Sequence, residues 1–489
     1  MTTSNTSSSP APDQWLGHPR GLAILFSAEL WERFSYYGMR ALLVLYVIEA
    51  LGSTEAEAYA LYGVYGAIVY AFGVIGGYMA ERFVGQLRAI VVGGVLMAMG
   101  HLVMAIPGNA GLYLALALLC VGNGLFKPNV STLVGALYDD GDRRRAQAYY
   151  LFYMGINFGA MLAPVVCGAV ADRFGWHFGF GLAGIGMLLG LLVLLRGRRL
   201  LRPVPGSVPS RSGRSVAVRL GLAIVVMVAL CVVLLHEHAW GQLAIELVSM
   251  AVVVTLLSLA LRQPAGARGR LLALVVLMAF HTAFWAAFEQ VGSSFTVLAN
   301  GHVDRELLGL TIPAPALLAI NGLFIITLAP LVSSLWGRLA RRGLEPSIPV
   351  KFAMGLGLLG AGFLVFALGI DRGIATAEIA LGWMVLCYLL LSLGELCLSP
   401  VGLAMVTELS PRHVVGFCMG AWFLTYANGH LLAGWIATAT SGGSAASQGL
   451  PRYAEVFGAV GVGALGLAAV LLLLRPWLRR MIEGRNPQG

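Results

Sequence analysis

Apolar stretches long enough to span a bilayer recur along the whole chain. A helix needs about 20 mainly apolar residues to cross roughly 30 Å of hydrocarbon. Stretches of this kind lie at roughly 21–49, 57–81, 88–106, 111–137, 146–171, 177–195, 216–236, 240–261, 271–299, 312–337, 348–369, 374–409, 413–440 and 454–475. With 58% hydrophobic and 11% charged residues, the chain is predicted to be an all-α membrane protein with fourteen transmembrane helices.

Basic residues are distributed unevenly among the predicted loops. If the N-terminus is cytoplasmic, 25 of the 32 Lys and Arg residues fall in cytoplasmic segments. The four predicted outside are Arg173, Arg305, Arg372 and Arg452, and the three within helices are Arg33, Arg40 and Lys127. Cytoplasmic loops of membrane proteins are enriched in Lys and Arg. We therefore expect both termini to be cytoplasmic, and the basic charge does not indicate nucleic-acid binding.

The helices divide into two sets of six around a shorter insertion. We expect a disordered tail at 1–19, an N-terminal six-helix bundle at 20–199, a cytoplasmic linker at 200–215, an inserted helix hairpin at 216–262, a C-terminal six-helix bundle at 263–480 and a tail at 481–489. The linker is rich in Pro, Ser, Gly and Arg, which is typical of loops. Two equivalent halves are the layout of many secondary transporters.

The first predicted helix carries a stripe of polar residues. Its members follow the spacing i, i+3, i+4, i+7, i+8 and i+11 and are Glu29, Glu32, Arg33, Tyr36, Tyr37 and Arg40. This spacing places all of them on one helix face. A charge at the bilayer centre costs about 2.5–3.5 kcal/mol on insertion scales. The stripe is therefore expected to face a wet cavity or partners on other helices.

Three further ionisable residues stand alone in later apolar stretches: Lys127, Glu289 and Glu395. A lone buried charge belongs either to a structural ion pair or to a transport pathway. Together with the first helix, the set has four acids and three bases, or two bases if Arg40 faces the outer mouth. Burial disfavours a charged carboxylate. At least one Glu is therefore expected to hold a proton near neutral pH, which is what a proton-coupled carrier needs.

Lys127 is one of only two lysines in the chain, beside 30 arginines. A lysine in the membrane is able to lose its proton, whereas an arginine is not. Two roles stay open at this stage. Lys127 either switches its charge during transport or is an ammonium that fits where a guanidinium does not.

Several kinds of chemistry lack their sequence signatures. There is no GxxxxGK[ST], HExxH or GxSxG motif, which disfavours ATP hydrolysis and the usual membrane enzymes and leaves an ion gradient as the energy source, with no cofactor. The six cysteines have no CxxC spacing, so neither disulfides nor a metal site is predicted. Helix residues His101, His281 and His430 are assigned to packing.

The motifs resemble those of a known family. ELWERFSYYG at 29–38 resembles the first-helix signature of the proton-dependent oligopeptide transporters, a branch of the major facilitator superfamily. GGYMAERFVGQLR at 76–88 and the FYMGINFG run within 135–164 are similar to further family blocks, as are FWAAFEQVGSSF at 284–295, RRGLEPSIPVKF at 341–352 and GELCLSPVGLAMVTELSP at 394–411. They occur in family order over nearly the whole chain. The inserted helix pair is also similar to bacterial members.

The resemblance implies a central cavity that opens alternately to each side, with roles for particular residues. Arg33 and Lys127 would attract a peptide carboxylate, and Glu395 with Asn157 and Asn321 would hold the amino terminus. The residues expected along the backbone are Tyr36, Tyr37 and Tyr70, those bordering side-chain pockets are Trp285 and Trp422, and those handling protons, besides Lys127, are Glu29, Glu32 and Glu289. Two departures are Gly322 after Asn321, where the family usually has Pro, and the absence of His from the second helix.

The resulting prediction is a proton-coupled symporter that imports di- and tripeptides across a bacterial inner membrane and functions as a monomer. The alternatives are a carrier of another anion such as nitrate, and a peptide sensor without transport. Glu395 disfavours the first because an acid opposite the bases suits a ligand with an amino group. The short termini and linker disfavour the second.

Overall fold

The computed structural model describes residues 14–108, 111–139, 142, 144–201, 214–411, 414–441 and 449–483. Most of the two expected tails and most of the expected linker therefore lie outside the described residues. The first set of helices is α1 (Arg20–Leu45), α2 (Glu55–Met79), α3 (Gln86–Met104), α4 (Leu112–Ala136), α5 (Arg144–Phe174) and α6 (Trp176–Gly197). π-Helical turns extend α1 and α2 over Tyr46–Ala50 and Ala80–Val84, and a 3-10 turn follows α6 at Arg198–Leu200.

The remaining helices are α7 (Arg214–His236), α8 (His238–Leu261), α9 (Ala265–Phe288), α10 (Ser294–His302), α11 (Ala319–Arg341), α12 (Ile348–Gly373), α13 (Leu381–Leu409), α14 (Val415–Thr440) and α15 (Gly449–Glu483). 3-10 turns occupy Glu289–Gly292 and Ala314–Leu318. Six two-residue strands pair as β1 (Gln14–Trp15) with β2 (His18–Pro19), β3 (Val303–Asp304) with β6 (Ile379–Ala380), and β4 (Glu306–Leu307) with β5 (Leu310–Thr311). The all-α prediction is confirmed.

Twelve helical segments of the described chain are long and apolar enough to cross a membrane. α1 and α14 are not among these twelve, although each has 26 residues. In α1, four charged residues between Glu29 and Arg40 break up the apolar sequence. Both helices lie inside the protein, α1 against α5 and α6 and α14 against α2 and α9, so their polar residues avoid lipid. Together they complete the fourteen expected spans.

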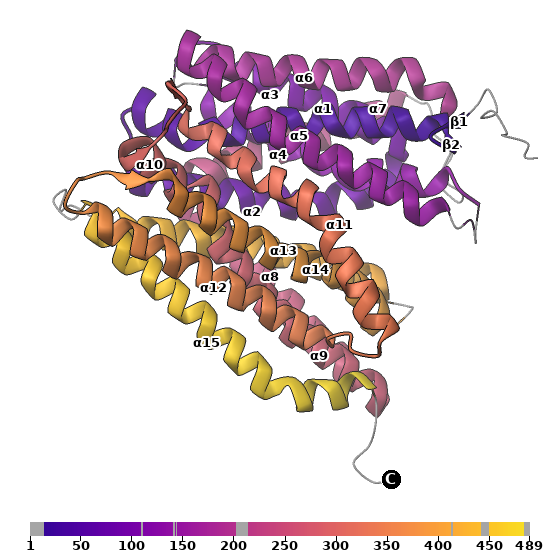
Figure 1. Cartoon of the computed structure of the whole chain (residues 1–489). Helices are drawn as coiled ribbons and strands as arrows, with labels where there is room; N and C mark the ends of the chain where they lie inside the picture. The colour runs from indigo at the N-terminus through magenta and orange to yellow at the C-terminus, as the bar shows by residue number, and fades with distance from the viewer. Residues whose placement is uncertain are drawn as a thin grey trace, which may run out of the picture.

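The helices form two halves, each with its own hydrophobic core (Figure 1). In the upper half of the view, α1 packs against α5 and α6, and α3 packs against α4 and α6. In the lower half, α12 packs against α13 and α15, and α9 packs against α14 and α15. Helices α7 and α8 lie at the periphery of the two cores, with only 11% and 17% of their apolar segments buried. They bridge the halves, because α7 contacts α4 while α8 contacts α2, α9 and α14.

Two expected helix boundaries are wrong. The stretch at 271–299 is a single helix by hydropathy, but it breaks after Phe288 into a 3-10 turn, and Ser293 leaves the helical region with φ −125° and ψ −99°. The hydroxyls of Ser293 and Thr296 donate to the carbonyls of Glu289 and Val291, which satisfies part of the freed backbone. The stretch at 374–409 becomes helical only from Leu381, because residues 374–380 connect α12 to α13 and include β6.

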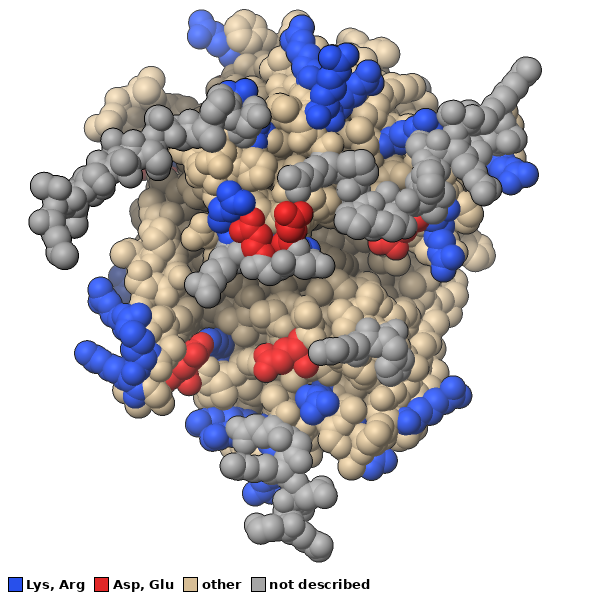
Figure 2. Space-filling view, turned by 90° about the vertical axis from the view of Figure 1, so that its right-hand side faces the viewer, with Lys and Arg blue, Asp and Glu red and all other residues tan. Residues whose placement is uncertain are grey.

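The two halves meet closely at one end and separate at the other. A Cβ added at Gly63 of α2 would lie 3.1 Å from Cα of Gly434 in α14. Small residues let membrane helices approach in this way. The open end carries the start of α5 and the end of α11. Figure 2 shows this face, with a hollow between the halves and many Lys and Arg side chains around it.

Candidate substrate and proton site

The first part of the polar face of α1, which carries Glu29, Glu32 and Arg33, is buried within the first half. The Arg33 guanidinium, 1% exposed, pairs with both oxygens of the Glu32 carboxylate at 2.5 and 2.6 Å. The amide of Asn123 in α4 donates to Glu32 Oε1 at 2.9 Å. Glu29 Oε1 lies 3.7 Å from Arg33 Nε, and Glu29 Oε2 has no hydrogen-bond partner among the described residues. Glu32 is therefore held firmly by Arg33, and Glu29 only loosely.

Aromatic rings cover the bases of this half. The Arg33 guanidinium lies 4.8 Å from the ring centre of Tyr36 and 5.7 Å from that of Tyr37, and the Lys127 ammonium lies 5.6 Å from that of Tyr70. Lys127 interacts electrostatically with Glu29 and Glu32, but within the described chain no carboxylate lies at ion-pair distance from it. Lys127 is therefore a cation without a dedicated counter-ion.

The second half contributes an acid, Glu395, that also has no ion-pair partner among the described residues. The Asn321 amide in α11 donates to Glu395 Oε2 in α13 at 3.2 Å and to Ser392 Oγ at 3.0 Å. No basic side chain of the described residues forms an ion pair with Glu395. Asn157 in α5 donates to the Tyr153 carbonyl of its own helix at 2.9 Å and makes no described contact with Glu395. The structure thus places Asn321 beside Glu395, in spite of the Gly322 departure, but does not bring Asn157 to it.

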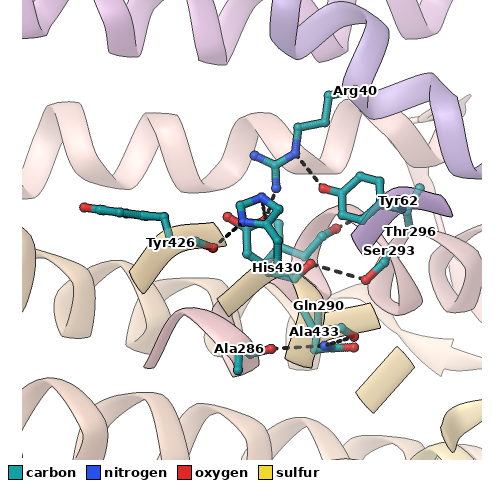
Figure 3. A network of polar contacts seen from close by, with 11 residues as sticks. Arg40, Tyr62, Ala286, Gln290, Ser293, Thr296, Tyr426, His430 and Ala433 are labelled. Atoms are coloured by element: carbon teal, nitrogen blue, oxygen red, sulfur yellow. Dashed lines mark hydrogen bonds and ion pairs between the residues drawn. The ribbon is translucent and has the colours of Figure 1, made fainter. Parts of the chain in front are cut away.

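Arg40 connects the two halves at the closed end of the hollow (Figure 3). Its guanidinium forms an ion pair with Glu289 Oε2, and its Nε donates to the Tyr62 hydroxyl of α2 at 2.5 Å. Nε2 of His430 in α14 lies 3.5 Å from the same Glu289 oxygen. Glu289 sits in the 3-10 turn that ends α9, so the helix break turns this carboxylate toward the other half. Arg40 therefore pairs with an acid of the second half and does not simply face an outer mouth.

Trp285 and Trp422 belong to an aromatic cluster held together by His281. The Trp285 indole N–H donates to His281 Nε2 at 2.9 Å, and His281 Nδ1 lies 2.6 Å from Thr425 Oγ1. Because Nε2 accepts, Nδ1 carries the proton of a neutral ring. The rings of His281 and Trp422 lie 3.8 Å apart. Trp422 is fully buried, whereas Trp285 is 8% exposed.

The residues of both halves share one region. The Tyr37 phenol is within electrostatic reach of Arg33, Arg40, Glu289 and Glu395, and the ring of Tyr70 in α2 stacks on that of Tyr426 in α14 at 5.1 Å. Mid-helix polar residues around this point are partly exposed, namely Tyr37, Tyr70, Lys127, Asn157, Asn321, Glu395 and Tyr426. The partly exposed polar residues thus come from both halves, whereas Glu29, Glu32, Arg33 and Glu289 are buried beside them.

Sequence reasoning missed several members of this arrangement. They are the pairing of Arg40 with Glu289 and with Tyr62, the pairing of Asn123 with Glu32, and the residues Tyr426, His281 and His430. The histidines stand alone in apolar helices, and no local pattern separates a packed histidine from one that faces an acid on another helix.

The comparisons with known proteins fit this geometry. The model of the POT family matches residues 87–455. The chain belongs to this family. A peptide transporter from Yersinia enterocolitica is 36% identical to this chain, in an alignment that covers 100% of this chain and 99% of the relative. Dipeptide and tripeptide permease B from Salmonella typhimurium is 34% identical, in an alignment that covers 97% of this chain and 98% of the relative. The crystal structure of a POT peptide transporter in complex with alafosfalin matches with a TM-score of 0.83 and 35% identity over 96% and 97%.

Membership of the POT family confirms three predictions made from the sequence. The fold is of the major facilitator type, with two six-helix bundles and two inserted helices. The protein is a membrane transporter, and its family consists of transporters and not of enzymes. The resemblance of the first-helix and later motifs to this family was correct.

Proposed function

We propose that the protein is a proton-coupled symporter that imports di- and tripeptides by alternating access. The observation that carries the proposal is the pair of ions without dedicated partners, Lys127 on α4 of the first half and Glu395 on α13 of the second. A zwitterionic peptide has a carboxylate and an ammonium several ångströms apart, which suits two opposite charges on facing halves. The names of the Yersinia and Salmonella relatives support a peptide as the substrate.

In this proposal the peptide carboxylate binds first at Lys127 and then at Arg33. Lys127 is accessible, whereas Arg33 is covered by Glu32 and the tyrosine rings. The amino group binds Glu395, oriented by Asn321, and Asn157 completes the polar wall. Side chains along the peptide are Tyr36, Tyr37 and Tyr70, and those bordering its side-chain pockets are Trp285 and Trp422. Because the two ends of the ligand attract opposite halves, binding favours their closure.

Proton coupling follows from competition for Arg33. A peptide carboxylate that pairs with Arg33 displaces Glu32, whose second hydrogen bond, from Asn123, cannot neutralise its charge. An uncompensated buried carboxylate is costly, so Glu32, or the loosely held Glu29, takes up a proton. Glu289 handles a proton in the same way where it exchanges partners with Arg40. Peptide and proton then bind together.

The open side of the hollow is proposed to be cytoplasmic. It lies at the ends of α2, α5, α11 and α14 that adjoin the predicted cytoplasmic loops, and basic side chains are abundant there (Figure 2). Enrichment of Lys and Arg on this side supports the orientation. With both termini inside, the protein would work as a monomer in the bacterial inner membrane, and the arrangement described above would be its inward-open state.

Uptake of labelled dialanine into proteoliposomes tests the proposal. With an inward proton gradient, dialanine is expected to accumulate above its external concentration, and without the gradient it should only equilibrate. Transport of nitrate but not of dialanine would indicate the anion carrier. Binding of dialanine without any uptake or counterflow would indicate the sensor.

A further inference from the structure

His430 is a buried histidine that faces an acid across the two halves. Its side chain is 1% exposed, and Nδ1 lies 2.9 Å from the backbone carbonyl of Tyr426, four residues earlier in α14. A carbonyl oxygen only accepts hydrogen bonds, so Nδ1 carries a hydrogen. In the neutral ring Nε2 is then an acceptor. This nitrogen lies 3.5 Å from Glu289 Oε2 and has no hydrogen-bond partner among the described residues.

Two acceptors facing each other in a buried site call for a proton between them. If both Glu289 and His430 are deprotonated, a lone pair on Nε2 points toward a carboxylate oxygen, and a buried polar atom without a partner costs free energy. One proton removes this penalty wherever it binds. On Glu289 it makes a carboxylic acid that donates to His430 Nε2, and on His430 it makes an imidazolium that donates to Glu289 Oε2. The oxygen concerned is the one that pairs with Arg40, so the proton and Arg40 compete for one atom.

The surroundings hold the imidazole in this position. A Cβ added at Gly66 of α2 would lie 1.9 Å from His430 Cδ2, so only glycine leaves room for the ring. The Tyr70 ring lies 5.3 Å from it on the same side. The charged or titratable groups around the pair are Arg40, Tyr36 and Tyr37 from α1, Tyr62 and Tyr70 from α2, Glu289 from the turn after α9, Glu395 from α13, and Tyr426 from α14 itself. Arg40, Glu289 and Glu395 are the groups among these that carry formal charge when ionised.

We infer that His430 is a proton-handling residue that exchanges the transported proton with Glu289. The transfer moves one proton from Glu289 Oε2 to His430 Nε2, leaves the total charge of the pair unchanged and regenerates the carboxylate that Arg40 binds. With the proton on Glu289, the ion pair to Arg40 is lost. Because this contact joins α1 to the end of α9, at the closed end of the hollow, protonation there loosens the closure between the halves. The inference rests on the proposed proton-coupled transport.

The test compares His430→Gln with wild type in proteoliposomes. A glutamine side chain donates a hydrogen bond but cannot release a proton. The initial rate of gradient-driven dialanine uptake is expected to fall about 100-fold, the lower end of what a positioned proton donor or acceptor contributes in catalysis, and its dependence on external pH should flatten. Dialanine counterflow, which needs no net proton movement, should stay within about twofold of wild type, given that distant groups act nearly additively.

A matched control is His101→Gln, the same change at a buried histidine whose Nε2 bonds to the Ser35 hydroxyl and not to an acid. It should keep both gradient-driven uptake and its pH profile. Combining His430→Gln with Glu289→Gln should cost no more gradient-driven uptake than Glu289→Gln alone, because each change removes the same exchange.

Three results overturn the inference. In the first, His430→Gln shows the same gradient-driven uptake and the same pH profile as wild type. In the second, His430→Gln loses dialanine counterflow together with uptake. In the third, the double variant loses as much gradient-driven uptake as the sum of the two single variants. Failure of the proposed function looks different, because wild-type protein itself would then show no gradient-driven accumulation.

Discussion

Replacing Glu395 should weaken peptides selectively through their amino group. In Glu395→Ala the carboxylate that faces the first half is removed, and Asn321 keeps its hydrogen bond to Ser392. A dipeptide then loses the counter-ion of its ammonium, whereas an N-acetylated analogue of the same peptide has no ammonium to lose. Glu395→Gln keeps the size of the side chain and removes only the charge, so it separates loss of charge from loss of volume.

The size of this effect follows from the contacts. Among the described residues, the Asn321 amide at 3.2 Å is the hydrogen-bond partner of Glu395, and it contacts Oε2, which leaves Oε1 for the ligand in the proposed binding mode. A hydrogen bond to a charged group contributes about 1.5–3 kcal/mol net. At 1.4 kcal/mol for each factor of ten, dipeptide affinity should fall roughly 10- to 150-fold. Affinity for the N-acetylated analogue should change by less than about twofold, which corresponds to a few tenths of a kcal/mol.

The assay is competition by each unlabelled ligand against labelled dialanine counterflow in proteoliposomes. Ser392→Ala, one turn away on α13, is the control because it removes the other partner of Asn321 without removing the charge. It should affect both ligands equally and little. Equal losses of the dipeptide and of the N-acetylated analogue in both Glu395 variants, or no loss in either, would refute the assignment of Glu395 to the amino group.

Variants at three further positions test other parts of the site. Lys127→Ala should abolish uphill dialanine uptake, and a fully active variant would remove Lys127 from the mechanism; Lys127→Arg, which keeps the charge but cannot release a proton, separates its two possible roles. Glu32→Gln should stop gradient-driven uptake and spare counterflow, so loss of both, or of neither, contradicts competition for Arg33. His281→Leu leaves the Trp285 indole N–H without its acceptor, at a cost of about 1–3 kcal/mol. Its KM for aromatic dipeptides should rise more than that for dialanine, and equal changes would show that His281 does not position this pocket.

Much of the site is already visible in the sequence because it depends on local periodicity. The stripe from Glu29 to Arg40 needs only the 3.6-residue repeat of one helix to fall on one face. The structure buries its members from Glu29 to Tyr36 and leaves Tyr37 and Arg40 partly exposed. Lys127, Glu289 and Glu395 stand out because a charge in an apolar helix is costly. Hydropathy, however, missed the break after Phe288, because the 3-10 turn Glu289–Gly292 has only four residues and a window long enough to detect a spanning helix averages over it.

The sequence by itself determined the number of spanning helices, their division into two halves and the set of buried acids and bases. Only the tertiary structure decided which of these ions are paired: Arg33 with Glu32, Arg40 with Glu289, and Lys127 and Glu395 with no dedicated counter-ion. Arg40 and Glu289 are 249 residues apart, and His430 reaches the same carboxylate from a third helix. Such distances depend on how closely helices pack, through contacts such as Gly66 against His430, and helix packing leaves no periodic trace in the chain.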